Sequence, residues 1–438
     1  MIKKVILTPF QKFISIESLS GILLLGTTVL AFIWANSPYS SSYTALWNQK
    51  IGFSTIGFEL YKPLILWIND GLMAIFFFLI GLEIKRELLI GELNSLKKTA
   101  FPLLGAIGGM LAPIIFYLLL NDNPNASHGW GVPMATDIAF SLAVLQTLGK
   151  RIPLSLKVFL TAFAIVDDIG AVLVIALFYS GDIATNYLLI GLGLLATLYL
   201  VSFRGFYSRF LLFSIGAVIW FCFLKSGIHP TVAGILLAFA VPIRQRIKTP
   251  EFLENLYEIT DKFRQAKRLE EPILSNDQIY QVDDLQDWIN RYQSPLQQLE
   301  HSLHGWVAYL IIPLFALANA GVSIVSETPL DTDLITTMII CLIAGNSLGV
   351  TSMVLIFSKL KLVEIPKDIN LRHIIGVAFL AGVGFTMAIF IASLAFSGTP
   401  ELIDSAKVGI LLGSIISAFI GYMILRFTGP KQDVPTST

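Results

Sequence analysis

The run LTAFAIVDDIGAVLVIALF, residues 160–178, carries two adjacent carboxylates, Asp167 and Asp168, in the middle of an otherwise apolar stretch. A bilayer core requires about 20 predominantly apolar residues per helix. An acidic side chain at that depth is costly, and it marks a functional site by default. The stretch therefore predicts a membrane helix whose chemistry centres on this pair.

The composition of the whole chain is that of a membrane protein. Hydrophobic residues make up 55% of the 438 residues and charged residues 14%, whereas soluble domains carry about 25% charged residues. The net charge is zero, which argues against a nucleic-acid partner. Cys222 and Cys341 lie in apolar runs, so we expect them to pack in the interior, and we expect no disulfide framework, metal cluster or cofactor.

Hydropathy predicts an all-α polytopic protein with twelve spans. A basic N-terminus precedes the first span, and no small-residue cleavage site follows it, so we expect this span to be retained. The predicted spans are 13–36, 63–89, 100–120, 129–148, 153–180, 183–202, 206–224, 227–242, 303–325, 334–358, 371–397 and 403–426. Eight spans thus lie in residues 1–243 and four in 301–426.

The distribution of lysine and arginine predicts the orientation. An even number of spans puts both termini on one side, which then holds most of the basic residues, residues 244–300 and the 427–438 tail. The other side holds four lysines, namely Lys50, Lys62, Lys225 and Lys407. Cytoplasmic loops are enriched in basic residues, so both termini are predicted to be cytoplasmic.

Two connections have internal structure of their own. Residues 43–62 are rich in aromatic and β-branched residues and predict a β-hairpin on the outer face, with an irregular interfacial loop as the alternative. A lone hairpin is marginally stable, so it should pack on something, such as a second copy of itself. Residues 244–300 show apolar positions at helical spacing and predict two amphipathic cytoplasmic helices, with a solvated linker as the alternative.

The adjacent acids suggest cation and proton chemistry. Neighbours on a helix point about 100° apart, so both Asp167 and Asp168 are expected to reach one cavity. Two carboxylates this close disfavour each other's ionisation, so their titration should be coupled. Oxygen ligands suit hard cations such as sodium. A pair buried against a basic partner is the alternative.

Two further spans are interrupted. In GVPMATDIAFSLAVL (131–145), Pro133 precedes Thr136 and Asp137, which could bind backbone groups freed by an unwound turn; a simple kink is the alternative. In AFLAGVGFTMAIFIASLAF (378–396), Gly382 and Gly384 break the pattern, unless they only permit tight packing. Both are middle members of three-span groups, which is typical of inverted repeats with a binding site at the interruptions.

Titratable residues also gather at predicted cytoplasmic ends. IGLEIKRELLIGE (80–92) places Glu83, Arg86 and Glu87 at i, i+3 and i+4 spacing. LEHSLHGW (299–306) adds Glu300, His301 and His304. Because histidine titrates near neutral pH, such a group could respond to pH, or it could be an ordinary solvated interface. On the outer side His229, in SGIHPTVAG (226–234), is isolated, and a structural role is the simpler interpretation.

At these residues the sequence resembles the NhaA family of bacterial sodium–proton antiporters. The resemblance covers about residues 13–243 and 300–425. Its matching runs, in order, are DGLMAIFFFLIGLEIKREL, GWGVPMATDIAFSLAVL, FLTAFAIVDDIGA, SGIHPTVAG, LEHSLHGWVAYLIIPLFALANAG and GVGFTMAIFIASLAF.

The resemblance implies a fold, a function and roles for these residues. It implies twelve helices with spans 4 and 11 broken and crossing, and dimerisation through the outer hairpin. It implies that Asp167 and Asp168 bind Na⁺ or Li⁺ and protons, with Thr136 and Asp137 beside them. The pH-responsive positions that it implies are Glu83, Arg86, Glu87, Glu300, His301, His304 and His229. The activity implied is pH-regulated export of Na⁺ or Li⁺ against H⁺ across a bacterial inner membrane.

The chain also departs from the family pattern. The family usually has a lysine facing the carboxylate pair, in a GKPLG-like run, whereas this chain has AGNSLGV (344–350), with Asn346 at the lysine position. Lys359 lies 13 residues further on, about 20 Å along a helix, and cannot substitute. The ion stoichiometry is therefore in doubt. Pro230 follows His229, and residues 244–300 are longer than the usual connection.

Other functions make different demands on the sequence. A sodium-coupled organic-anion symporter on the same fold needs polar residues on several helices to hold the solute. An intramembrane aspartyl protease needs its two aspartates on different helices, and a membrane prenyltransferase needs two aspartate-rich motifs, but this chain has one adjacent pair. We therefore expect a transporter and no enzyme. A channel would be distinguished by ion flux without proton movement.

Overall fold

The computed structural model describes residues 9–55, 58–91, 96–245, 247–265, 273–323 and 330–428, and these are mainly helical. The first part contains α1 (Pro9–Ala35), α2 (Ser40–Asn48), β1 (Lys50–Thr55), β2 (Phe58–Pro63), α3 (Leu64–Leu66), η1 (Trp67–Leu72), α4 (Met73–Leu89), α5 (Leu96–Leu120), η3 (Pro124–Met134), α6 (Ile138–Thr147), η4 (Gly149–Arg151), α7 (Leu154–Phe178), α8 (Thr185–Phe203), α9 (Arg209–Ser226) and α10 (Pro230–Phe239). The second part contains α11 (Thr249–Gln265), α12 (Asn276–Tyr292), α13 (Pro295–Trp306), η5 (Val307–Ile311), α14 (Ile312–Asn319), α15 (Thr332–Ile340), η6 (Cys341–Gly345), α16 (Asn346–Lys359), α17 (Leu371–Ala381), α18 (Phe385–Ala395) and α19 (Pro400–Phe427).

The described residues include eight helices long and apolar enough to cross a membrane. The number rises to ten if each of two bent pairs, one at α1–α2 and one at α17–α18, forms a single span. Two predicted spans, 129–148 and 227–242, instead contain the short apolar helices α6 and α10. The chain is a multi-pass membrane protein.

The region predicted as a hairpin is part helix and part strand. Residues 43–48 were expected to be extended, but they belong to α2, where Tyr43 packs edge-on against Trp34 and Trp47. The strands β1 and β2 pair antiparallel, with Lys50 opposite Pro63. The predicted strand start was wrong: residues 43–48 form part of α2, with Tyr43 and Trp47 buried, and strand pairing begins at Lys50.

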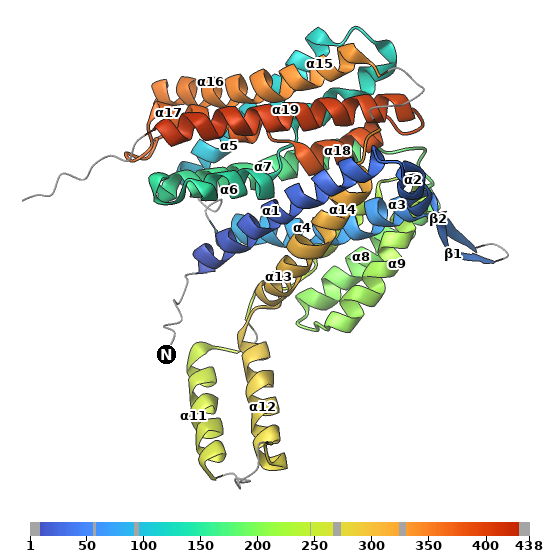
Figure 1. The fold of residues 1–438 in the computed structure, drawn as a ribbon. Coiled ribbons are helices and arrows are strands. Elements are labelled where there is room, and N and C mark those ends of the chain that lie inside the picture. Colours follow the sequence, from blue (N-terminus) through green and yellow to red (C-terminus); the bar gives the residue numbers. More distant parts are fainter. Residues whose placement is uncertain are drawn as a thin grey trace, which may run out of the picture.

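The transmembrane helices form two bodies that lie on either side of the molecule (Figure 1). The first body comprises residues 9–91 and 181–323, in which α4 packs on α10 and α1 on α14. The second body comprises residues 96–179 and 330–428, in which α5 packs on α16 and α17 and α15 pack on α19. The main helix contact between the bodies is α1 on α6, where a Cβ at Gly21 would lie 2.9 Å from the Ala139 carbonyl oxygen.

Polar contacts tie the first body together internally. Asn69 and Asn319 exchange two buried side-chain hydrogen bonds, at 2.9 and 3.3 Å, between η1 and α14. The ammonium group of Lys85 donates to the carbonyl oxygens of Phe239 and Val241 at the C-terminal end of α10. A cation there complements the negative end of the helix dipole, so Lys85 fixes α10 against α4.

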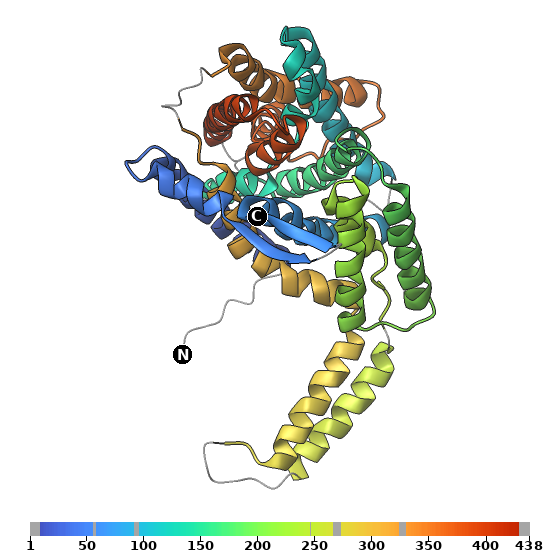
Figure 2. The ribbon, with the colours of Figure 1, turned by 90° about the vertical axis from the view of Figure 1, so that its right-hand side faces the viewer.

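Helices α11 and α12 lie side by side and project beyond the rest of the molecule (Figures 1 and 2). Phe252 and Tyr292 stack at 4.2 Å between their rings, and Ile259 is the one buried residue within these two helices. The region 244–300 contains α11, α12 and the start of α13, whereas the sequence predicted two helices there, and α11 and α12 stabilise mainly each other.

Candidate functional site

Two interruptions of helical structure meet inside the second body. The 3₁₀ helix η3 ends at Met134, and α6 begins at Ile138 after three extended or irregular residues. Helices α17 and α18 are bent by 42° at residues 382–384. The backbone N–H of Asp137 donates to the carbonyl oxygen of Val383 at 2.6 Å, which joins the two interruptions directly.

Small residues allow this close approach. A Cβ added at Gly384 would lie 2.7 Å from the Ala135 carbonyl oxygen, and one at Gly382 would lie 2.5 Å from the Ser417 hydroxyl. Real Cβ atoms do not approach other atoms so closely, so the two glycines are required by packing. Pro133 lies in η3 just before the interruption, buried with Gly131 and Met134.

Asp137 joins the N-terminal ends of two half-helices. Its Oδ1 accepts a hydrogen bond from the Phe140 N–H at 3.1 Å and so caps α6. Its Oδ2 accepts from both the backbone N–H and the hydroxyl of Thr386 at the start of α18, at 3.1 and 2.5 Å. A carboxylate is favourable at a helix N-terminus, and this one is 3% exposed. Asp137 therefore compensates both positive ends.

Neutral donors bind the carbonyl groups at the opposite, C-terminal ends. The hydroxyls of Thr136, Ser141 and Ser417 donate to the last carbonyl oxygens of α17, those of Ala381, Leu380 and Phe379, at 2.7–2.9 Å. The amide of Asn346 donates to the Pro133 carbonyl oxygen of η3 at 3.1 Å. Hydroxyl and amide groups thus satisfy these carbonyls without adding a positive charge.

The two adjacent acids of α7 have different surroundings. Asp167 is 1% exposed, and its Oδ2 accepts from the Thr136 N–H at 2.8 Å. Its Oδ1, like the Oδ1 of Asn346, is buried and has no hydrogen-bond partner among the described residues. Asp168 instead lines a cavity that Asp167 does not line. In this conformation Asp167 turns toward Thr136, and that both acids reach one cavity stays a prediction.

The cavity lies between the two bodies and has a volume of about 40 Å³. Half of its lining residues belong to each body. The second body contributes Thr136, Asp137, Ile138, Ala139, Ile165, Asp168, Thr386 and Met387, and the first contributes Phe76, Leu79, Ile80, Glu83, His304, Val307, Ala308 and Ile312. The arrangement offers oxygen ligands on one wall and an apolar surface with Glu83 and His304 on the other.

Beyond Glu83 and His304 lies a partly buried ion-pair cluster. Arg86 pairs with Glu87 at 2.8 Å and with Glu300 of α13. His304 Nδ1 lies 3.9 Å from Glu83 Oε1. The structure therefore brings together five of the six residues predicted at these ends, whereas His301 is exposed on α13. The ion pair between Arg86 and Glu300 joins α4 to α13. Helical spacing relates residues of one segment only, so it did not predict this contact.

His229 belongs to a separate polar group. Its Nδ1 lies 2.8 Å from the Thr231 hydroxyl, and its Nε2 lies 3.7 Å from Asp70 Oδ1. Asp70 also pairs with Lys62 of β2 at 3.1 Å. Asp70 was not predicted as a site residue, although it is an acid inside the predicted span 63–89, which is the same signal that marked Asp167. Phe390, whose ring lies against His229, carried no sequence signal.

The chain is similar to known proteins along nearly its whole length. The family model described as Na⁺/H⁺ antiporter 1 matches residues 11–425. The chain belongs to the NhaA family of Na⁺/H⁺ antiporters. It is 47% identical over 424 residues to the Na⁺/H⁺ antiporter NhaA of Oleidesulfovibrio alaskensis, covering 96% of this chain and 94% of that protein. It is 44% identical over 427 residues to NhaA of Helicobacter acinonychis, with 96% of each chain covered.

The resemblance seen in the sequence is thereby confirmed, and Na⁺ and H⁺ are the transported ions. These NhaA relatives are named as antiporters, so a sodium-coupled organic-anion symporter is not supported. Asp168, Asp137 and Thr136 all line the cavity between the bodies, while Asn346 contacts Pro133 beside it.

Proposed function

We propose that the chain exports Na⁺, and Li⁺ as an alternative cargo, from the cytoplasm in exchange for external H⁺ by alternating access. The observation that carries the proposal is the cavity between the bodies, with Asp168 on one wall. In one orientation Asp168 releases a proton and binds the cation with help from Thr136. In the other orientation a proton displaces the cation, and only loaded states cross.

The distribution of contacts supports movement of one body against the other. Hydrogen bonds such as Thr136 to Ala381 and Asn69 to Asn319 each stay within one body. The contacts between the bodies at Gly21 and Phe390 are packing contacts, with Ala139 and Ala143 at the first and with aromatic rings at the second. Apolar contacts are non-directional, so one body can slide without breaking the polar network that holds the site.

Asp167 has a separate role in this scheme. Its unpartnered Oδ1 can take up a proton without displacing the Thr136 N–H from Oδ2. Asn346 provides no charge to offset an ionised Asp167. We therefore infer that this protein moves less net charge per cycle than relatives with lysine at that position.

The membrane arrangement is part of the proposal. Eight long helices, two bent pairs and two short apolar helices support twelve crossings, with broken spans 4 and 11 crossing at the site. The distribution of basic residues supports cytoplasmic termini in a bacterial inner membrane. The paired strands β1 and β2 are proposed to mediate a homodimer, and the cluster of Arg86, Glu87 and Glu300 with Glu83 and His304 is proposed to set the pH response.

Reconstitution tests the proposal directly. In proteoliposomes with a preset proton gradient and a pH-sensitive dye, adding sodium should dissipate the gradient. Asp168→Asn should abolish the response, and Asp287→Asn, on the projecting α12, should leave it unchanged. An undiminished response of Asp168→Asn would overturn the proposed role of Asp168.

A further inference from the structure

Phe390 is a fully buried residue of α18 whose aromatic neighbours all belong to the other body. Its ring centroid lies 5.7 Å from that of Phe77, 6.0 Å from that of Phe315 and 5.4 Å from that of His229. Phe390 belongs to the second body, and the three neighbours belong to the first. The cluster therefore forms a contact between the surfaces that must separate if the bodies move.

The cluster lies beside the ion cavity on the side away from Glu83 and His304. Phe390 follows Thr386, which lines the cavity, by about one helical turn. Phe77 precedes Glu83 by about 9 Å along α4, and Phe315 follows His304 by about 16 Å along the α13–α14 segment, at about 1.5 Å per residue. All three elements thus pass the cavity and then meet at the aromatic cluster.

The far side of the cluster is marked by polar groups at the predicted external face. The Nδ1 atom of His229 lies beside the Thr231 hydroxyl, and its Nε2 atom faces Asp70. Both nitrogens therefore have polar neighbours other than Phe390, whose ring packs edge-to-face with the imidazole. Asp70 in turn pairs with Lys62 of β2. The aromatic rings therefore separate the ion cavity from the Asp70 and Lys62 group.

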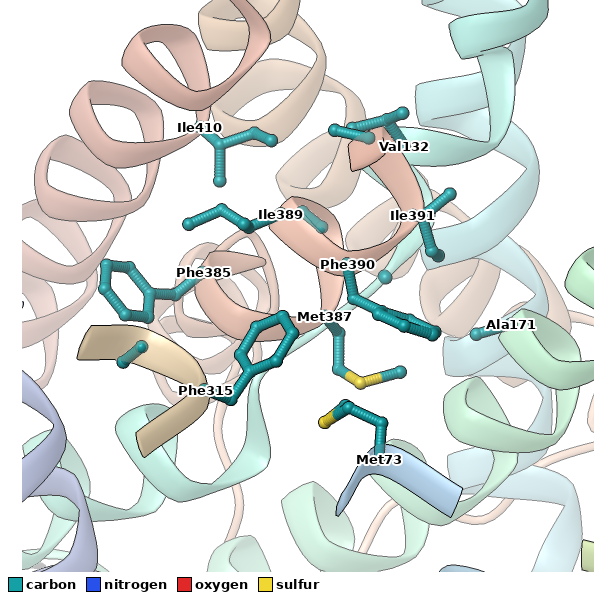
Figure 3. Close-up of a cluster of buried hydrophobic side chains, with 14 of the residues drawn as sticks. Met73, Val132, Ala171, Phe315, Phe385, Met387, Ile389, Phe390, Ile391 and Ile410 are labelled. Carbon is teal, nitrogen blue, oxygen red and sulfur yellow. The ribbon is translucent and has the colours of Figure 1, made fainter. Parts of the chain in front are cut away.

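Apart from His229, the side chains described around Phe390 are apolar. Figure 3 shows Met387 and Met73 next to its ring, with Ala171 of α7 beside it. Met73 is 2% exposed and Ala171 is 1% exposed. An ion leaving the cavity in this direction would have to give up water without gaining a polar partner, which is strongly unfavourable.

We propose that Phe390, packed against Phe77, Phe315 and His229, is the outer barrier of the ion cavity in this conformation and prevents sodium from crossing without proton exchange. The contact consists of ring packing and can part when one body moves. The predicted effect of Phe390 on ion coupling rests on the proposed alternating access. The predicted effect on access of a reagent to the cavity does not.

Accessibility to a thiol reagent tests the barrier independently of transport. The parent protein carries Met387→Cys in the cavity wall, with Cys222→Ala and Cys341→Ala to remove the two buried thiols. A membrane-impermeant thiol reagent is added outside right-side-out vesicles. Adding Phe390→Ala should raise the labelling rate at residue 387 by roughly tenfold or more, because the cavity that replaces the ring adjoins the polar group of His229 and Asp70.

Phe396→Ala is the matched control. Phe396 is 2% exposed and follows α18 directly, but a Cβ at Gly129 would contact its ring, so its packing partner is in the same body. This control should leave the labelling rate at residue 387 unchanged. Equal acceleration by both variants, or none by Phe390→Ala, would overturn the inference.

Coupling provides the second readout. Phe390→Ala proteoliposomes should pass more ²²Na⁺ per proton exchanged than wild type, whereas Phe390→Leu, which keeps apolar bulk, should stay near the wild-type ratio. If Phe390→Ala is poorly folded, Phe390→Leu and Phe390→Val still test the barrier. The labelling rate at residue 387 should rise as the volume of the side chain at position 390 falls. Absence of exchange in wild type would refute the proposed function but leave the labelling result intact.

Discussion

Thr386 donates two hydrogen bonds to one oxygen of Asp137, from its backbone N–H and from its hydroxyl. The same carboxylate caps α6 through Phe140. One buried acid thus joins two half-helices that are far apart in sequence. Asp137 therefore holds the two half-helices together. Asp168 is the acid of α7 that lines the cavity.

Removing the Thr386 hydroxyl should loosen this junction. A hydrogen bond to a charged group contributes about 1.5–3 kcal/mol, and about 1.4 kcal/mol corresponds to a tenfold change. We expect Thr386→Val to raise the sodium KM or lower the transport rate by roughly tenfold and to lower the melting temperature. Ser393→Ala is the control, because that hydroxyl bonds locally to the Phe390 carbonyl within α18. Wild-type kinetics in Thr386→Val would contradict the role of the junction.

Introducing a charge at position 346 should change the electrogenicity. Asn346→Lys places a cation near the Pro133 carbonyl that Asn346 now binds, and it can pair with an ionised Asp167. We expect the variant to move more net charge per cycle than wild type, measured as a shift in reversal potential under known sodium and proton gradients. Identical reversal potentials in the two proteins would refute the inference.

Neutralising Glu300 should move the pH profile of transport. Loss of its negative charge leaves Arg86 balanced by Glu83 and Glu87 alone among its named acidic neighbours, so the neighbourhood of His304 and Glu83 becomes more positive. A more positive neighbourhood disfavours bound protons. We expect half-maximal activity of Glu300→Gln at a lower pH, by roughly half a unit. Glu258→Gln, in the exposed Glu258–Lys262 pair of α11, should leave the profile in place, and a shift to higher pH in Glu300→Gln would contradict the argument.

The projecting helices should be dispensable for exchange. The Leu296 N–H donates to the Pro242 carbonyl oxygen at 3.2 Å, so the ends of the intervening segment are already close. We expect replacement of residues 247–293 by a short Gly/Ser linker to preserve sodium-dependent proton exchange. Loss of exchange in a variant with a normal melting temperature would show that α11 and α12 take part in transport.

The chemistry of the site was more predictable than its geometry. Asp167, Asp168 and Asp137 were evident from the sequence because an acid in an apolar span is costly and is retained mainly for function. The separation of Asp167 from the cavity was not evident, since it depends on which face of α7 meets Thr136 in the folded protein. The sequence predicted an interruption of span 129–148 at Pro133. It did not predict that residues 124–134 form a 3₁₀ helix, or that the Pro133 carbonyl oxygen accepts a hydrogen bond from Asn346.

Partners that are distant in sequence account for the other misses. Arg86 pairs with Glu300 in another helix, and Asn69 pairs with Asn319. No local pattern encodes such pairs. Phe390 is one of 31 phenylalanines, and only its contact with rings of the other body distinguishes it.

The central claim is that sodium and a proton compete for Asp168 in the cavity between the two bodies. Calorimetric titration of sodium into the purified protein, repeated in buffers of different ionisation enthalpy, measures the protons released per sodium bound. We predict proton release in wild type, no measurable binding in Asp168→Asn, and retained binding with reduced proton release in Asp167→Asn. Sodium binding without proton release in wild type, or unchanged binding in Asp168→Asn, would contradict the account.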